Sequence, residues 1–438
     1  MLSSQKILKS ISAQIYPLVI IIALAVVLRL MYLVLFGNTL SMQTSGYDDY
    51  AVNLIAGHGY TRFADFHPDS DLPPLYSFFL AGVYLILGRS PIPVAFIQIG
   101  FDVITILAIY AIGTRIMGRA VGLLAAAFFA FYPYLLFQDL TVNDTAIFIM
   151  LLAVGIWAAY HIEKPQDWRW AVVIGFCFGL AALTKSMVIL MLPLLALAWL
   201  WRWKLHAVKP ILTMSLLFLL VIAPWIIRNT RLQGTFTLIS LNDGSNLYQG
   251  NNPCIADILL AGWDAQWANC LAPKPAGLTE SEEASWYRDQ ALTYLKTHVD
   301  QWPRLFAAKF IDLWNPDLMP NSVPPFANLS NDAVLQYEQA AFQLARKLHL
   351  LYFTPLLILG LLGLGLAWKD RRPIWPLVSV MIMITVAYLI YHPSTRYRSP
   401  ADPFLFVLSA YGVVWIALAI RERIRNTRRA DSKVAPSV

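Results

Sequence analysis

The chain has 438 residues, of which 58% are hydrophobic and 13% are charged. A soluble core of this size cannot bury so much apolar surface, so the composition excludes an ordinary soluble globular protein and indicates a membrane protein. The formal charge of +7 does not point to nucleic acid, because Lys and Arg form short clusters between apolar runs rather than one basic face. The positive-inside rule explains such clusters, and no nucleic-acid partner is expected.

Apolar runs along the chain predict an all-α polytopic protein with about ten transmembrane helices, since a span needs roughly 17–25 residues. The first run is too long and too uniformly apolar for a cleaved signal peptide, so we count it as a helix. Residues 75–87 form a shorter apolar run that is expected to lie along the outer interface. The predicted spans are residues 15–36, 92–114, 120–137, 145–162, 170–183, 188–203, 210–227, 350–368, 374–391 and 404–420.

The basic clusters predict the orientation. A cytoplasmic amino terminus places six basic clusters on the inside, so both termini are expected to be cytoplasmic in a plasma (inner) membrane. These clusters are Lys6/Lys9, Arg115/Arg119, Lys164/Arg169, Arg202/Lys204/Lys209, Lys369/Arg371/Arg372 and Arg421/Arg423/Arg425/Arg428/Arg429. The chain then divides into three parts. Residues 1–227 form an N-terminal transmembrane catalytic module with a first outer loop at 37–91, and residues 228–349 form an extracytoplasmic segment. Residues 350–438 form C-terminal transmembrane helices with an outer loop at 392–403 and a basic cytoplasmic tail. Helices in the extracytoplasmic segment are predicted at 280–298, 303–313 and 332–349.

The first outer loop contains two adjacent carboxylates. Residues 46–57 are predicted to form a short amphipathic helix, with Asp48 and Asp49 in its first turn. The helix dipole favours carboxylates there, and this alone explains the pair. Adjacent helix positions point about 100° apart, so only one of the two can face a given pocket. If one is catalytic, the other is structural or binds a different group.

Four more outer residues are candidates for a polar site. Asp144 follows a tight outer turn, where it either caps the helix that starts at residue 145 or faces a site. Lys185 is a cation on the outer side, so it either snorkels to lipid headgroups or binds an anionic ligand. Arg396 and Arg398 lie two residues apart in the late outer loop. Their guanidinium groups suit bidentate phosphate binding, although an interfacial Arg/Tyr anchor explains the spacing equally well.

Two of the three cysteines, Cys254 and Cys270, lie in the same predicted outer loop. An oxidising outer compartment favours a disulfide between them, and two unpaired thiols are the alternative.

Several segments together resemble a known family. They are Gly46–Tyr60, Pro73-Pro74-Leu75-Tyr76, residues 133–144, Pro224-Trp225-Ile226-Ile227-Arg228-Asn229, Asn246–Pro253 and Arg396-Tyr397-Arg398-x-Pro400. In order and membrane side they resemble the dolichyl-phosphate-mannose:protein mannosyltransferase-like branch of the GT-C glycosyltransferases, which includes the bacterial lipid A aminoarabinose transferases.

The resemblance implies a membrane glycosyltransferase that moves a hexosyl or pentosyl group from a polyprenyl-phosphate carrier to an acceptor on the outer face. The acceptor is a lipid, a glycan or a protein. Family members use an acid of the first outer loop as the catalytic base, for which Asp48 is the match, Asp49 the alternative and Asp144 the supporting second acid. Relatives often carry the first acid a few residues before a tyrosine equivalent to Tyr47, where this chain has Gln43.

The resemblance also suggests binding roles. The donor phosphate is expected to contact Lys185, Arg228, Arg396 and Arg398. The acceptor or sugar is expected to contact Tyr47, His58, Tyr76, Asn246, Tyr248 and Asn251. No Gly-rich nucleotide loop or Cys/His zinc spacing is present in the sequence, which favours a lipid-linked donor. A divalent cation, Mg²⁺ or Mn²⁺, stays open as a cofactor, and Asp48 and Asp144 would hold it.

A transporter or flippase of lipid-linked sugars is the main rival. Its ionisable groups would be expected near mid-membrane in broken helices within inverted repeats. In this sequence the ionisable groups concentrate in outer loops and no repeat is evident. A non-catalytic lipid-binding protein is a second rival, which a turnover assay separates from an enzyme.

Overall fold

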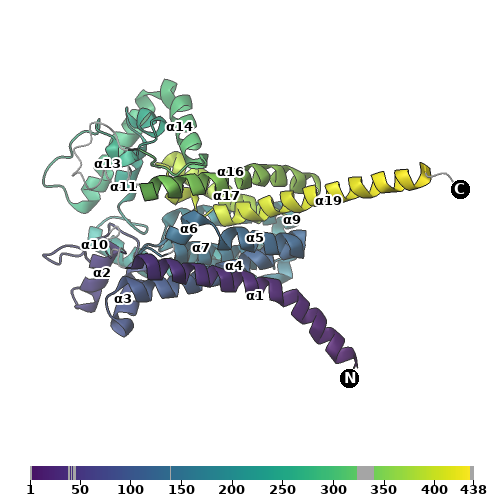
Figure 1. Ribbon diagram of the computed structural model, residues 1–438. Helices are drawn as coiled ribbons and strands as arrows, with labels where there is room; N and C mark the ends of the chain where they lie inside the picture. The colour runs from purple at the N-terminus through teal and green to yellow at the C-terminus, as the bar shows by residue number, and fades with distance from the viewer. Residues whose placement is uncertain are drawn as a thin grey trace.

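The computed structural model describes residues 2–37, 40, 42, 46–138, 140–322 and 340–434. All regular secondary structure in these ranges is helical. Figure 1 shows long helices packed side by side in a bundle, with both termini at one end and the shorter helices at the other. The all-α expectation is therefore confirmed for the described ranges.

Five stretches in the described part of the chain are long and apolar enough to cross a membrane. They are Tyr16–Phe36 in α1 (Leu2–Phe36), α4 (Pro91–Met117), Ser186–Gln233, Phe342–Lys369 in α16 (Ala340–Lys369) and Asp402–Thr427 in α19 (Asp402–Val434). The stretch Ser186–Gln233 contains α9 (Met191–Trp203) and α10 (Val208–Gln233). Shorter apolar helices are α3 (Leu75–Leu87), α5 (Arg119–Ala130), α7 (Thr145–Ala159), α8 (Arg169–Ala182) and α17 (Trp375–Ile390). The chain is thus a multi-pass membrane protein, and the count of ten spans stays a prediction.

Two predicted helices differ from the structure. The span expected at 120–137 is interrupted, because α5 ends at Ala130 and α6 (Pro133–Gln138) starts at a proline, which suits the first position of a new helix. The helix expected at 332–349 is not separate over the part that is described. Its residues 340–349 belong to the long helix α16, and residues 332–339 lie outside the described ranges.

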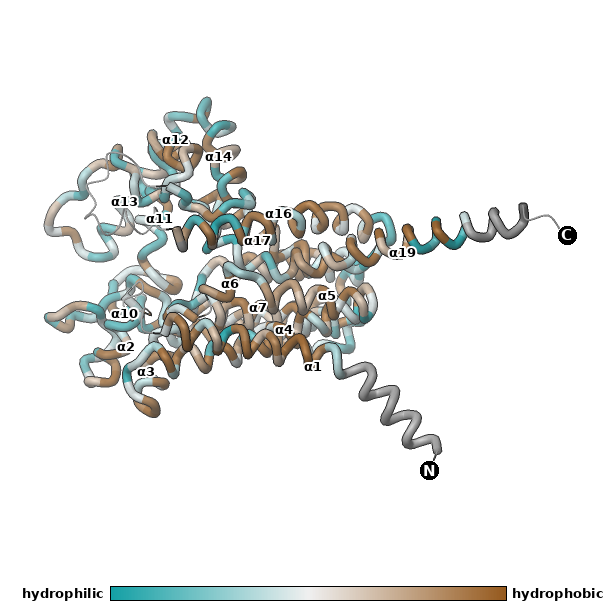
Figure 2. Tube along the Cα trace, viewed as in Figure 1, coloured by the Kyte–Doolittle hydropathy of each residue, from teal (hydrophilic) through white to brown (hydrophobic). Residues whose placement is uncertain are grey.

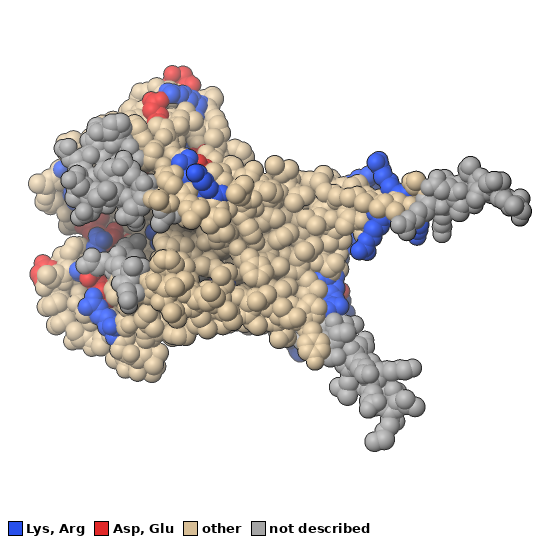
Figure 3. Space-filling model, viewed as in Figure 1, with Lys and Arg blue, Asp and Glu red and all other residues tan. Residues whose placement is uncertain are grey.

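The surface shows how the bundle relates to a bilayer. Hydrophobic residues dominate the middle of the bundle in Figure 2. On the face shown in Figure 3, Lys and Arg gather at the end where the termini emerge, and charged residues reappear at the opposite end. This uncharged belt between two charged ends fits a membrane-spanning bundle.

The interior of the bundle contains one ion pair that links three helices. Arg29 of α1 donates to Asp102 of α4 at 2.6 Å and to the carbonyl of Ala130 at the end of α5 at 3.0 Å. Both charged side chains are almost fully buried. Close packing continues at Gly122, where an added Cβ would overlap Thr114 and the backbone of α4.

The end of the bundle opposite the termini is built from short helices, and it is called the outer end after the orientation predicted from sequence. The first outer loop contributes α2 (Tyr47–Ile55) and α3, and the later segment contributes α11 (Asp243–Gly250), α12 (Ile255–Leu260), α13 (Glu280–Thr297) and α14 (Trp302–Trp314). Thr279 and Glu282 form a capping box that starts α13. The expected helices at 280–298 and 303–313 are therefore present. Cys254 and Cys270 are joined by a disulfide in this segment.

Candidate active site

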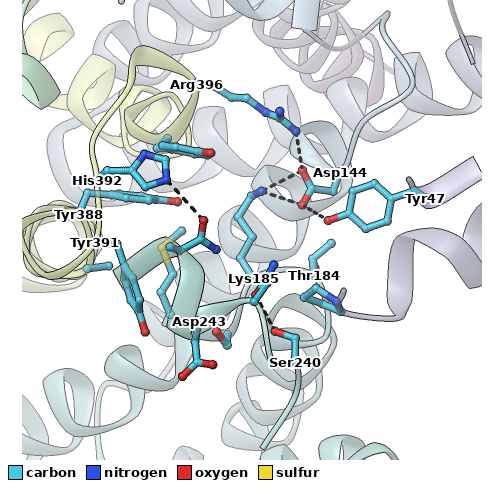
Figure 4. Close-up of a pocket in the computed structure, with 17 residues that line it drawn as sticks. Tyr47, Asp144, Thr184, Lys185, Ser240, Asp243, Tyr388, Tyr391, His392 and Arg396 are labelled. Carbon is cyan, nitrogen blue, oxygen red and sulfur yellow. Dashed lines mark hydrogen bonds and ion pairs between the residues drawn. The ribbon is translucent and has the colours of Figure 1, made fainter. Parts of the chain in front are cut away.

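A pocket of about 240 Å³, here called the central pocket, opens at the outer end of the bundle. Its walls come from the start of α2, the α6–α7 and α8–α9 connections, α11, the end of α17 and the late outer loop (Figure 4). Segments far apart in sequence thus meet at one polar site. The lining includes Tyr47, Asp144, Lys185, Asn242, Asp243, Asn246, Tyr388, His392, Arg396 and Tyr397.

A buried carboxylate, Asp144, is bonded by three groups of the pocket. Lys185 Nζ lies 2.9 Å from Oδ1 and 2.7 Å from Oδ2, and the hydroxyl of Tyr47 donates to Oδ2 at 3.2 Å. Arg396 approaches Oδ1 at 3.8 Å. Asp144 makes no side-chain cap bond to α7. Asn143 instead accepts from the backbone N–H of Thr145, so capping does not explain the aspartate.

The charges of this cluster shift its protonation equilibria. Burial alone would raise the pKa of Asp144, but the cations Lys185 and Arg396 outweigh burial and lower that pKa below its usual value. Burial lowers the pKa of Lys185, and the charge of Asp144 partly offsets this. With two cations and one carboxylate, the cluster carries a net positive charge and suits an anionic ligand.

The late loop supplies Arg396 and an aromatic wall. Arg396 lies in the short helix α18 (Thr395–Arg398), and its Nε is buried without a hydrogen-bond partner among the described residues. Tyr397 stacks on Tyr388 with ring centres 4.8 Å apart, and His392 meets Tyr397 edge-on at 5.4 Å. Burial lowers the pKa of His392 to about 4, so the imidazole is neutral at pH 7. The wall presents neutral rings beside the charged cluster.

A second carboxylate, Asp243, lines the same pocket at the start of α11. In the view of Figure 4 it lies at the bottom of the pocket and Arg396 at the top. One of its oxygens accepts from Arg288 at 3.1 Å, and the other has no hydrogen-bond partner among the described residues. The side chain of Asp243 is 37% exposed, against 1% for Asp144, although its oxygen without a partner is buried.

The structure does not place Asp48 in the central pocket. Its buried carboxylate accepts from Tyr84 at 2.8 Å and from the guanidinium of Arg89, so it fastens α2 to α3 and the connection that follows. Asp49, the neighbouring residue, is exposed and also lies outside the lining. Neither acid lines the central pocket, because α2 turns Tyr47 toward the pocket and Asp48 toward Arg89, and their role as the base stays a prediction.

Two expected phosphate ligands are structural. Arg398 is completely buried, pairs with Asp402 at 3.2 Å and donates to the carbonyl of Asn315. Arg228 donates to backbone carbonyls of Asp69 and Tyr60, and so holds the first outer loop. Neither lines the central pocket, because both guanidinium groups are used inside the protein.

Four of the six expected acceptor or sugar ligands also lie outside the lining of the central pocket. His58 is exposed and stacks on Phe66, while Tyr76 donates to Gln98 and packs edge-on against Tyr47. Tyr248 is buried and accepts from the N–H of Ala272. Asn251 is buried between Lys309 and carbonyls of nearby helices. Tyr47 and Asn246 are the two that line the pocket.

A metal site of the expected kind is not formed. No group of three or more His, Cys, Asp or Glu side chains suited to an ion occurs within the described ranges. Asp48 and Asp144 do not converge, because Arg89 occupies one and Lys185 the other. The residues present therefore do not fit a cation held by this pair.

Two residues that line the central pocket were not predicted from the sequence: the carboxylate Asp243 and the aromatic residue Tyr388. Asp243 lies in the Asn242-Asp243-Gly244 run just before the matched Asn246–Pro253 segment, so its position next to that segment was the available signal. Tyr388 lies inside an apolar span, where a tyrosine near the outer end is ordinarily an interfacial anchor.

Comparison with known proteins shows which fold the chain has and which family part of it resembles. Residues 71–227 match the family model described as dolichyl-phosphate-mannose-protein mannosyltransferase, and these residues include Asp144 and Lys185. No curated protein matches the chain as a whole or in part.

Solved structures extend the likeness over nearly the whole chain. The archaeal oligosaccharyltransferase AglB from Archaeoglobus fulgidus, in complex with an inhibitory peptide and a dolichol-phosphate, has a TM-score of 0.51 at 13% identity, covering 97% of this chain and 52% of its own. The same enzyme in complex with Zn and sulfate has a TM-score of 0.52 at 14% identity, covering 92% of this chain and 50% of its own. ArnT from Cupriavidus metallidurans bound to undecaprenyl phosphate gives 13% identity and a TM-score of 0.41, covering 90% of this chain and 77% of its own.

These findings confirm the resemblance expected from sequence. The helical bundle has the fold of the GT-C glycosyltransferases, and the chain spans about half the length of the archaeal oligosaccharyltransferases that it matches. Residues 71–227 are similar to the dolichyl-phosphate-mannose-protein mannosyltransferase family.

Proposed function

We propose that the protein is a membrane glycosyltransferase that takes a hexosyl or pentosyl group from a polyprenyl-phosphate carrier and transfers it on the extracytoplasmic face. The observation that carries this proposal is the pairing of Lys185 and Arg396 around Asp144 in one pocket at the outer end of the bundle. The dolichol-phosphate bound by the archaeal oligosaccharyltransferase of similar fold supports a carrier of this chemical class.

The donor phosphate binds at the Lys185–Arg396 pair. A phosphate oxygen accepts from Lys185 Nζ, and the unpartnered Nε of Arg396 is a further donor. Asp144 and Tyr47 hold the lysine in place, so the site is preorganised. As the bond between the anomeric carbon and the phosphate oxygen breaks, the phosphate keeps the electron pair and its charge grows beside these two cations.

The acceptor hydroxyl is deprotonated by Asp243. The new bond forms between its oxygen and the anomeric carbon, and its proton passes to the carboxylate. Asp243 is suited to this role because it lines the pocket and one of its oxygens has no hydrogen-bond partner in the described part of the chain. Asp144 stays in a supporting role, since Lys185 bonds both of its oxygens.

Turnover with defined donors tests the proposal. Purified full-length protein in proteoliposomes is incubated with a panel of synthetic polyprenyl-phosphate sugars, and release of free polyprenyl phosphate is measured. Release is expected with at least one donor and is expected to be lost in Lys185→Met. Movement of the intact donor across the bilayer without release would instead identify a flippase. Binding of the donor without release or movement would identify a lipid-binding protein.

A further inference from the structure

A second cavity, of about 590 Å³, lies at the outer end and is here called the outer cavity. It lies between the first outer loop, the end of α10 and α13. Residues of the segment 240–246 face both sides: Asn242 and Asp243 line the central pocket, whereas Leu241 and Ser245 line the outer cavity. The two cavities therefore share a wall that is one chain segment thick.

Hydrogen bonds between separate segments build the outer cavity. The carboxylate of Glu280 accepts from the N–H of Ser70 at 2.9 and 3.0 Å and from Gln233 Nε2 at 2.5 Å. The N–H of Leu241 donates to the carbonyl of Ser70 at 2.9 Å. Gly244 packs directly against the backbone of Ala284 in α13, where an added Cβ would overlap the carbonyl. These contacts join the first outer loop, residues 233–244 and α13 around the cavity.

The lining of the outer cavity has one more acid than it has Lys and Arg side chains. Arg62 pairs with Asp71 at 2.8 Å and Lys274 with Glu283 at 2.5 Å, and Glu280 adds one further acid. Figure 3 shows acidic and basic side chains together at this end of the molecule. No described cation in the lining lacks an acidic partner, so a phosphate or sulfate group would meet excess negative charge.

Ring faces complete the lining. Phe63 stacks on His67 with centroids 4.1 Å apart, and the ring of Tyr287 borders the same space. Apolar ring faces beside many hydrogen-bonding groups suit the two kinds of surface that a sugar presents, its C–H face and its hydroxyl groups.

We propose that the outer cavity binds the acceptor, and that the bound part of the acceptor is a neutral glycan bearing hydroxyl groups rather than phosphate or sulfate. This assignment rests on the proposed function of the central pocket, whose second substrate it names. Asp243, the proposed base, lies on the other side of the shared wall, so a glycan in the outer cavity is one chain segment away from it. The two substrates are thereby sorted by charge: the anionic carrier binds at the Lys185–Arg396 pair, whereas the one excess acid of the outer cavity disfavours an anionic group there.

An array of immobilised ligands tests this assignment. Full-length protein in detergent is applied to an array of neutral, amine-bearing, phosphorylated and sulfated glycans together with peptides. We expect retention on neutral glycans. Phe63→Ala and Tyr287→Ala should each weaken retention about tenfold, because each removes one ring face. Phe66→Ala is the matched control, since Phe66 lies in the same loop, is 42% exposed and stacks on His58 outside the cavity.

Three outcomes would overturn the proposal: preference for phosphorylated or sulfated glycans, retention on peptides alone, or retention on no glycan. Binding of polyprenyl phosphate is measured in the same preparation. If polyprenyl phosphate binds and no glycan does, the acceptor assignment alone fails. If polyprenyl phosphate does not bind, the proposed function fails as well.

Discussion

Replacement of Asp144 by Asn distinguishes two possible effects of Asp144 on the donor phosphate. Asp144 either positions and charges Lys185 for phosphate binding, or only repels the phosphate electrostatically. Asn keeps the shape of the side chain and removes the charge that both oxygens present to Lys185. The negative charge of Asp144 raises the pKa of Lys185, which burial already lowers, so its removal lowers that pKa further. A larger fraction of Lys185 is then neutral near pH 7, and the phosphate site loses a charged donor.

The expected magnitude follows from the contacts. Hydrogen bonds to charged groups contribute about 1.5–3 kcal/mol, so loss of the Lys185 charge should weaken polyprenyl-phosphate binding by roughly 10- to 150-fold. Because the phosphate requires protonated Lys185, the loss of lipid affinity should be greatest at high pH. The affinity should recover as the pH falls through the lowered pKa of Lys185. Breaking a buried pair also costs about 3–5 kcal/mol of stability, so folding is checked by thermal unfolding.

The assay is equilibrium binding of fluorescent polyprenyl phosphate to protein in nanodiscs between pH 5.5 and 8.5. Asp48→Asn is the matched control, because Asp48 is another buried, ion-paired aspartate at the outer end but lies outside the pocket. It should bind the lipid like the parent protein. If Asp144→Asn instead binds more tightly at every pH, Asp144 only repels the phosphate and the reasoning is refuted.

Three further predictions follow from the site and the bundle. Arg396→Lys should weaken lipid binding about tenfold because the fork is lost, whereas Arg398→Lys should lower the melting temperature and leave affinity unchanged; equal effects on affinity would contradict this assignment. Asp243→Asn should lower kcat by roughly 10²- to 10⁴-fold with donor affinity preserved, measured by stopped assays of released polyprenyl phosphate; unchanged kcat would remove Asp243 as base. Arg29→Met should lower the melting temperature by removing the buried ion pair with Asp102, and the added change Asp102→Leu should restore part of the loss in a double-mutant cycle. Additive losses would argue against the pairing.

Much of the architecture could be predicted from sequence because lipid imposes simple rules on it. Apolar runs predicted the helices α1, α4 and α7. Most of the predicted helix ends lie within a few residues of the observed ends. The break before Pro133 was not predicted, because residues 131–137 continue the apolar run although the helix itself is interrupted there.

A site residue could be predicted from the sequence only where its charge or polarity differed from that of the residues around it. Lys185 stood out as an outer cation among apolar residues, and it does line the central pocket. Arg396 and Arg398 looked equivalent in sequence, but the short helix α18 sends one to the pocket and buries the other against Asp402. Asp48 and Asp144 likewise differ through tertiary partners, Arg89 for one and Lys185 for the other, which spacing along the chain does not specify.

The central claim is that Lys185 and Arg396 hold the phosphate of a polyprenyl carrier. An electron cryomicroscopy map of the full-length protein with bound polyprenyl phosphate tests it most directly. The account predicts phosphate density within hydrogen-bond distance of Lys185 Nζ and the Arg396 guanidinium, beside Asp144. Phosphate density at Arg228 or elsewhere, with the Lys185–Asp144 pair undisturbed and the central pocket empty, would contradict it.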